Sequence, residues 1–171
     1  METWDAITSR RNVRQFAERE IAPDALDRIL EAGRRAPSSR NWQPWDFVVV
    51  TDREALRELS TVWRGAGHVA GSAATVALVV QETEDPHSAD RAEYDLGQAT
   101  MAMMIAAADL GIGSGHSAVA DQVKARALLG LPADRRVAYA IDFGYPADRP
   151  LKPIARPDRR PFDEVVHRGR W

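Results

Sequence analysis

The sequence predicts a single domain that combines strands and helices, of the α/β or α+β class. Two apolar runs, FVVV at 47–50 and TVALVV at 75–80, are typical of buried strands, and RVAYAIDF at 136–143 alternates as a strand does. Segments with helical spacing of apolar residues lie between these runs. With 171 residues, the chain can bury roughly 70% of the surface that it exposes when unfolded, which is enough for one domain.

The first 36 residues predict two helices on either side of a basic segment. A short helix at 3–9 is followed by RRNVRQF, and Pro23 is well placed to begin the second helix because the first turn does not need its missing N–H. This helix has to end before Pro37, since proline disfavours helical backbone in the residue that precedes it. Its buried face is expected to carry Leu26, Ile29, Leu30 and Gly33.

The middle of the chain predicts two further helices. Thr51 and Glu54 match a capping box, so a helix should begin directly after the strand at 47–50. Residues 81–90 are polar and contain Pro86, and we expect a loop there. The long helix that follows, from about 89 to 110, is apolar on nearly every side, as is typical of a helix that is buried all round. In a domain of this size, a second subunit could cover part of it.

The glycine-rich stretch GIGSGHSAV at 111–119 is expected to end the long helix, turn sharply and finish in a short strand. It does not match the dinucleotide fingerprint G-x-G-x-x-G for two reasons. It follows a helix rather than a strand, and His116 stands where the pattern needs its third glycine. An alternative is that its glycines bring backbone close to a flat ligand. A helix from Asp121 to Leu129, closed by Gly130, comes next.

Composition excludes several function classes. The chain has no cysteine, so disulfides, thiolate nucleophiles and cysteine-based metal sites are absent, and the four histidines are scattered without ligand spacing. The net charge of −2 gives no support to nucleic-acid binding. The N-terminus lacks an apolar signal core, and the most apolar stretch, 96–110, is too short to span a bilayer. We therefore expect a cytoplasmic protein with no metal and no membrane or nucleic-acid partner.

Two arginine groups are candidate anion sites. RRNVR at 10–14 could be a solvated basic turn, or a clamp in which guanidinium groups bind phosphate. RPDRRP at 156–161 lies in a proline-rich tail that shows little periodicity and cannot build a core of its own. Such a tail either remains free or packs against another surface, and a partner's surface is one possibility.

The segment PSSRNWQPW at 37–45 is the most specific feature. Its serine, asparagine and glutamine side chains can both donate and accept, as the edge of a flavin ring does. The structural alternative is a set of side-chain turns between two prolines, with the tryptophans in the core. We expect core packing for Trp45, whereas Trp42 could pack at an interface or line a pocket.

Taken in order, these motifs resemble the FMN-dependent nitroreductase family. The resemblance rests on RRNVRQF, on APSSRNWQPWDFVVV, on DLGQATMAMMIAAADLGIGSG, on LLGLP, and on FGYPADRP followed by RRPFDEVVH. It covers essentially the whole chain. It implies an α+β fold with a central, mainly antiparallel sheet flanked by helices. It also implies an intertwined homodimer of single-domain subunits spanning 1–171, in which the arm at about 145–171 packs on the partner.

The resemblance assigns a cofactor role to four segments. Arg10 is expected at the phosphate or ribityl end of FMN, and Arg14 near the N1 and O2 edge, where positive charge favours reduced flavin. The family usually has serine where this chain has Asn12. The segment from His116 to Val119 would pass one face of the ring, although the sequence there departs from the common pattern. The implied FMN-binding residues are Arg10, Arg11, Asn12, Arg14, Pro37, Ser38, Ser39, Asn41, Ser117, Ala118, Arg159 and Arg160.

The function implied is that of an oxidoreductase in which FMN carries the chemistry and no side chain is itself catalytic, with Arg14 in support. NADH or NADPH would reduce the flavin, and a nitroaromatic, quinone or related acceptor would then be reduced at the same face, by a ping-pong mechanism. The alternative is a flavin-binding relative with another redox chemistry, such as oxidation, dehalogenation or a deazaflavin-linked reaction, or a flavin store. The region 61–74 is short for the family, so the cover of the substrate pocket and the substrate itself stay open, as does the choice between Arg159 and Arg160 for phosphate.

Overall fold

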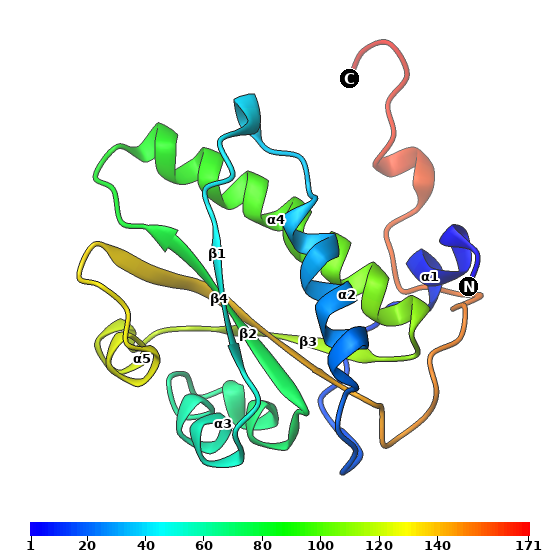
Figure 1. The fold of residues 1–171 in the computed structure, drawn as a ribbon. Coiled ribbons are helices and arrows are strands. Elements are labelled where there is room, and N and C mark those ends of the chain that lie inside the picture. The colour runs from blue at the N-terminus through cyan, green and yellow to red at the C-terminus, as the bar shows by residue number, and fades with distance from the viewer.

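The computed structural model describes residues 1–171 and contains one four-stranded sheet in the order β1-β2-β4-β3 (Figure 1). Each neighbouring pair of strands is antiparallel, because hydrogen-bonded partners run in opposite directions throughout. The expected α+β class with an antiparallel sheet is therefore confirmed. The strands are β1 (Asp46–Val50), β2 (Ala74–Gln81), β3 (Gly113–Ala118) and β4 (Arg135–Gly144).

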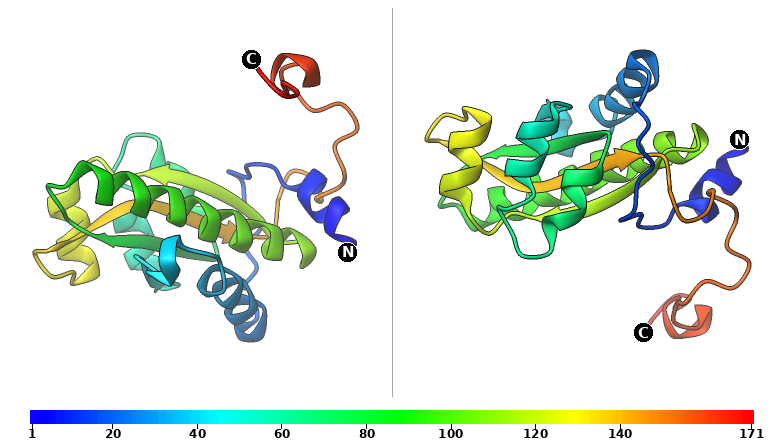
Figure 2. Two further views of the ribbon diagram at one scale, coloured as in Figure 1. Left: turned by 90° about the horizontal axis from the view of Figure 1, so that it is seen from above. Right: turned by 90° about the horizontal axis from the view of Figure 1, so that it is seen from below.

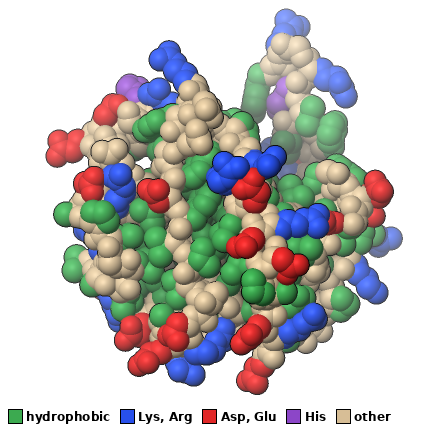
Figure 3. Space-filling model, viewed as in Figure 1, with side chains coloured by type: hydrophobic (Ala, Val, Ile, Leu, Met, Phe, Trp, Pro, Cys, Tyr) green, Lys and Arg blue, Asp and Glu red, His purple; other side chains and the backbone are tan.

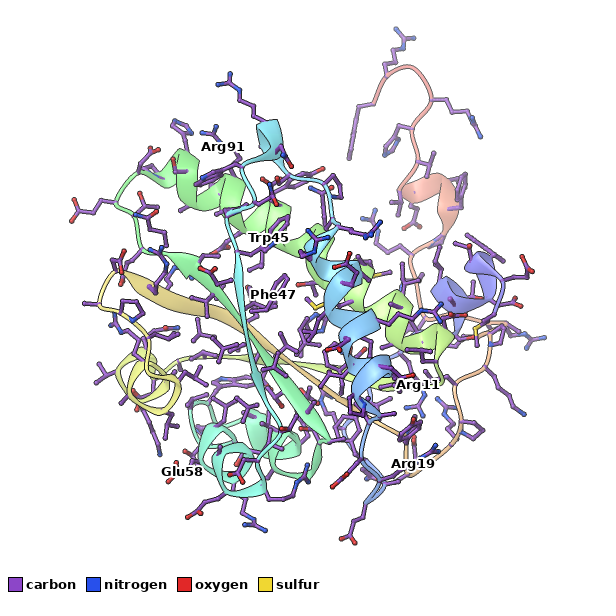
Figure 4. All side chains as sticks on the ribbon, viewed as in Figure 1. Arg11, Arg19, Trp45, Phe47, Glu58 and Arg91 are labelled. Atoms are coloured by element: carbon purple, nitrogen blue, oxygen red, sulfur yellow. The ribbon has the colours of Figure 1, made fainter.

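Two helices, α2 (Pro23–Arg34) and α4 (Pro86–Asp109), cover one face of the sheet. Their apolar residues bury the inward side chains of β2 and β4 in the larger core, which includes Ile29 and Met103. Trp45 belongs to this core, as expected, with 9% of its surface exposed. Its ring lies 6.3 Å from that of Phe47, with the two planes nearly parallel, and both side chains lie between β1 and the helices (Figure 4).

The opposite face of the sheet is covered by α3 (Arg53–Leu59), the 3₁₀ helix η2 (Ala66–Gly71) and α5 (Gln122–Leu129). A second, smaller core forms there. The short helix α1 (Thr3–Ser9) packs near the end of α4, where the N-terminal ammonium group contacts Asp109 at 2.6 Å. No helix of the chain combines the length and the apolar character that a membrane crossing needs.

The beginnings of two helices differ from the sequence expectation. Helix α3 is capped by Asp52, whose carboxylate accepts hydrogen bonds from the N–H groups of Glu54 and Ala55, so Thr51 is not the cap. Helix α4 begins at Pro86, within the stretch that the sequence indicated as a loop. Asp85 caps it, and proline is accepted in the first turn because no N–H is required there.

The glycine-rich stretch is mostly strand. Gly111 adopts φ of 72°, a left-handed conformation that lets the chain turn directly after α4. Strand β3 then begins at Gly113 and pairs with β4 along its whole length. The expected sharp turn is confirmed, and the strand after it is longer than the sequence indicated.

Residues 145–171 form an extended arm that leaves the body of the molecule (Figure 2). Its only regular element is the short η3 (Phe162–Glu164), and from residue 152 onward every residue is exposed. The start of the arm is held to the body, because the Arg19 guanidinium lies 3.7 Å above the Tyr145 ring. Beyond this point the arm has no core of its own. Hydrophobic and basic side chains are visible along it, at the upper right of Figure 3.

Candidate functional site

The basic segment at 10–14 lies beside β3 and extends the edge of the sheet. The Val13 N–H donates to the Ser114 carbonyl at 2.8 Å, and Asn12 pairs with Ser114 in parallel. This approach requires a glycine at position 115. A Cβ there would lie 2.7 Å from the Val13 carbonyl oxygen and 2.7 Å from Asp142 Oδ2.

Arg10, Asn12 and His116 lie at this edge, and the charge of Arg159, from the arm, acts on Arg10. We call these four residues the basic cluster. Arg10 is half-buried, and no carboxylate lies within ion-pair distance of it. Its Nη1 donates to Asn12 Oδ1 at 3.4 Å. Burial, and then the positive charge of Arg159, lower the pKa of Arg10 below its ordinary value. The cluster therefore brings two guanidinium groups together without a balancing carboxylate.

His116 shares this environment. Burial is the main cause that lowers its pKa below the ordinary value, the charge of Arg10 lowers it further, and Asp142 acts in the opposite direction. The lowered pKa favours the neutral imidazole. It can donate one hydrogen bond and accept another while Arg10 and Arg159 supply the charge.

Arg11 makes its contacts outside the basic cluster. Arg11 Nη2 donates to Asp148 Oδ1 at 2.7 Å and to the Arg149 carbonyl at 2.8 Å, so it ties the start of the arm to the N-terminal segment (Figure 4). This contact lowers the pKa of the Asp148 carboxyl. The Arg14 side chain is exposed.

The two arginines of the arm differ in their contacts. Arg159 bonds within the chain only to the Asp158 carbonyl, at 2.6 Å, and its charge reaches Arg10. Arg160 donates to the Glu164 carbonyl at 2.9 Å and lies 3.6 Å from the Glu164 carboxylate. Within one chain, Arg159 is therefore the one that joins the basic cluster.

The segment that contains Pro37, Ser38, Ser39 and Asn41 lies at the other end of α2, far from the basic cluster (Figure 1). One chain does not bring these two predicted groups together. The segment includes η1 (Ser39–Asn41) and is fixed by side chains: Ser38 Oγ accepts the N–H of Gln43 at 2.9 Å, and Asp95 accepts the N–H of Ser39 at 2.9 Å. Trp42 is 45% exposed and, with Gln43 and Arg135, lines an open pocket of about 370 Å³.

Ser117 and Ala118 lie at the end of β3. Ser117 is buried opposite Ala140 of β4, and its hydroxyl has no hydrogen-bond partner in the chain. Ala118 is half-buried opposite Tyr139, whose side chain is 45% exposed.

Three polar residues that the sequence reasoning passed over are buried next to these segments. Asp95 is 1% exposed on α4 and holds Ser39. His68 Nδ1 lies 3.0 Å from Asp142 Oδ2 behind Gly115, while His68 Nε2 and Asp142 Oδ1 have no partner. A signal existed for Asp142, which is a lone charge inside an apolar stretch, since a buried charge has to be hydrogen-bonded to be tolerated. Asp95 lies close to Arg91 and Glu93 in the sequence and carried no such signal.

Comparison with known proteins gives consistent matches over the chain. A family model described as the nitroreductase family matches residues 7–70 and 61–145. A protein of Archaeoglobus fulgidus, provisionally named NADH dehydrogenase/NAD(P)H nitroreductase, is 32% identical over 169 residues, which cover 96% of each chain. The NADPH-flavin oxidoreductase of Vibrio harveyi is 29% identical, over 99% of this chain and 74% of its own. The fold of an FMN-dependent nitroreductase from Clostridium difficile R20291 matches with a TM-score of 0.84 at 24% identity, covering 97% of this chain and 98% of that one.

Proposed function

The chain belongs to the nitroreductase family, and from this premise we propose that it is an FMN-dependent oxidoreductase that uses NADH or NADPH. Its acceptors would be nitroaromatic compounds, quinones or related small molecules, reduced by a ping-pong mechanism. The names of two relatives support the cofactors, since one refers to NAD(P)H and nitroreductase and the other to NADPH and flavin.

The observation that carries this proposal is the unbalanced charge of the basic cluster. Arg10 and Arg159 repel each other, and neither is paired with a carboxylate. A phosphate group bound between them would relieve that repulsion and accept forked hydrogen bonds from both. The phosphate of FMN has the charge and the acceptor oxygens that this donor set fits.

The backbone beside the cluster fits a flat ligand as well. Gly115 lets residues 12–14 lie against β3, so that Asn12 and His116 offer neutral donors and acceptors next to the arginines. When bound, FMN supplies the hydride chemistry, and the chain supplies binding, orientation and charge. Arg14 is exposed and unpaired, and in this proposal its charge favours the reduced, anionic flavin.

Exposed apolar surface supports a homodimer. On α4, 8 of the 24 residues are buried, whereas Tyr94 is 70% exposed and Met101 is 38% exposed. On the arm, Phe162 is 70% exposed and Val165 is 55% exposed, with nothing in the chain to cover them. In the proposed dimer, α4 meets its counterpart and the arm packs on the other subunit, which brings Ser39 and Asn41 of one subunit to the FMN of the other.

Absorption spectroscopy tests the proposal. The purified protein, loaded with FMN and freed of excess, is mixed with NADH or NADPH without oxygen. The visible flavin band should bleach, and a nitroaromatic or quinone should restore it. Steady-state rates at several acceptor concentrations should give parallel double-reciprocal lines, as a ping-pong mechanism requires.

Two other outcomes would change the assignment. Failure of the purified protein to bind FMN would refute the proposal. Full FMN loading without bleaching by either nicotinamide would favour the second candidate, a flavin-binding protein with another redox chemistry or a storage role.

A further inference from the structure

Asp95 is a buried carboxylate that no cation neutralises. It lies on α4 with 1% of its surface exposed, and no arginine, lysine or histidine lies within ion-pair distance of it. Three neutral donors contact it instead. The Ser39 N–H donates at 2.9 Å, the Ser39 hydroxyl at 3.3 Å and Gln98 Nε2 at 3.3 Å. Both donors of Ser39 are therefore engaged by one carboxylate.

The backbone that follows Ser39 is strained. Arg40, Asn41 and Gln43 have φ of 52°, 58° and 53°, a left-handed conformation that residues with a Cβ rarely adopt. Such a conformation persists only where its surroundings enforce it. Two contacts do so here: Asp95 holds the backbone before the strained residues, and Ser38 Oγ accepts the N–H of Gln43, the last of them. Charge-assisted bonds in a dry environment make Asp95 the stronger of the two.

We propose that Asp95 is a positioning residue for the flavin site of the partner subunit. It fixes Ser39 so that the side chain of Asn41 is held where it can bind the cofactor. The hydrogen bonds divide the roles: Ser39 has both donors occupied, whereas the Asn41 side-chain amide is exposed and has no partner in the chain. This inference rests on the proposed FMN-binding homodimer.

Electrostatics and positioning predict opposite effects of Asp95→Asn on the affinity for FMN. FMN is an anion, so removing a negative charge from the protein would by itself tighten FMN binding. Loss of the anchor would weaken it, because the amide presents an N–H₂ group toward the Ser39 donors and the strained segment relaxes. We expect the second effect to dominate, with the dissociation constant for FMN rising about tenfold or more.

The test is a titration of apo-dimer with FMN, followed by quenching of flavin fluorescence, for four proteins besides the wild type. These are Asp95→Asn, Asn41→Ala, the double variant, and Glu93→Gln as a matched control. Glu93 is on the same helix and pairs with Arg136 at 2.8 Å, away from Ser39. We expect both single variants to bind FMN more weakly, the double variant to bind no more weakly than Asn41→Ala alone, and the control to bind as the wild type does.

The outcomes separate the two proposals. Wild-type protein that binds no FMN overturns the proposed function. Normal or tighter FMN binding by Asp95→Asn overturns the positioning role alone, and so do additive losses in the double variant, because they would mean that Asp95 acts independently of Asn41. If Asp95→Asn does not fold, Ser39→Ala replaces it, with an expected loss of about threefold in the same non-additive pattern. Unchanged affinity in that variant overturns the inference.

Discussion

Replacing Gly115 with alanine tests whether the close contact between the N-terminal segment and β3 shapes the candidate site. The added Cβ would lie 2.7 Å from two oxygens, one of the Val13 carbonyl and one of Asp142, whereas ordinary contact begins at 3.4 Å. Neither oxygen can move freely. The first is backbone that bridges to Ser114, and the second is buried and bonded to His68.

The expected cost follows from this overlap. Overpacking of a dense interior destabilises by about 1–3 kcal/mol. For a chain of this length, each kcal/mol lowers the melting temperature by about 2–4 °C, so we expect a loss of about 2–12 °C. FMN binding should weaken as well, because residues 10–14 have to move away from β3.

Melting temperature is measured by circular dichroism on FMN-free protein at one fixed concentration, since a dimer's stability depends on concentration. Gly67→Ala is the control, because a Cβ at Gly67 meets no atom within 4 Å. That variant should stay within about 0.5 kcal/mol of the wild type. A Gly115→Ala protein that melts and binds FMN as the wild type does would refute the close-packing argument.

Three further predictions concern charges and a helix cap. Arg10→Ala should raise the FMN dissociation constant by about 10- to 150-fold, which corresponds to about 1.5–3 kcal/mol for a charge-assisted bond; calorimetry would measure it, and an unchanged constant would remove Arg10 from the site. Asp52→Ala should cost about 0.5–2 kcal/mol in urea unfolding and Thr51→Ala much less, because Asp52 makes the cap bonds; equal effects would contradict this assignment. His116 should titrate below its ordinary pKa in NMR spectra of the FMN-free protein, and Arg10→Ala should move that pKa upward by removing a positive charge. Because the pKa of His116 is lower in the folded than in the unfolded protein, the folding stability linked to it is fully present above the unfolded pKa of about 6.5. That stability is lost as the pH falls through the folded pKa. If the pKa of His116 does not respond to Arg10→Ala, the two groups are not close to each other.

Much of the fold could be predicted from local pattern. Apolar runs and alternation located the strands, and Pro23 marked the beginning of α2 correctly. Gly130 adopts φ of 63° and ends α5 where the sequence indicated. These features depend on residues that are neighbours in the sequence, so the sequence alone can predict them. The predicted N-cap of α3 was wrong by one residue. Thr51 and Asp52 are both good N-cap residues, and only the geometry of the turn in the folded protein selects between them.

The candidate site was harder to predict from the sequence, because its contacts join distant parts of the chain. Arg10 and Arg159 are 149 positions apart in the sequence, and only the fold lets the charge of Arg159 act on Arg10. Asp95 and Asp142 were missed for a related reason. The hydrogen-bond partner of each comes from a separate element, Ser39 for Asp95 and His68 for Asp142.

The left-handed backbone at 40, 41 and 43 has a consequence for anyone who sets out to raise the thermal stability of this protein. Glycine adopts such φ values freely, so Arg40→Gly and Gln43→Gly would relieve strain of about 1 kcal/mol each and would be among the first substitutions that a stability screen selects. The same changes would let the segment sample other conformations. A screen that rewards heat resistance alone would therefore favour variants in which the presentation of Asn41 is degraded, and selection should include cofactor retention from its first round.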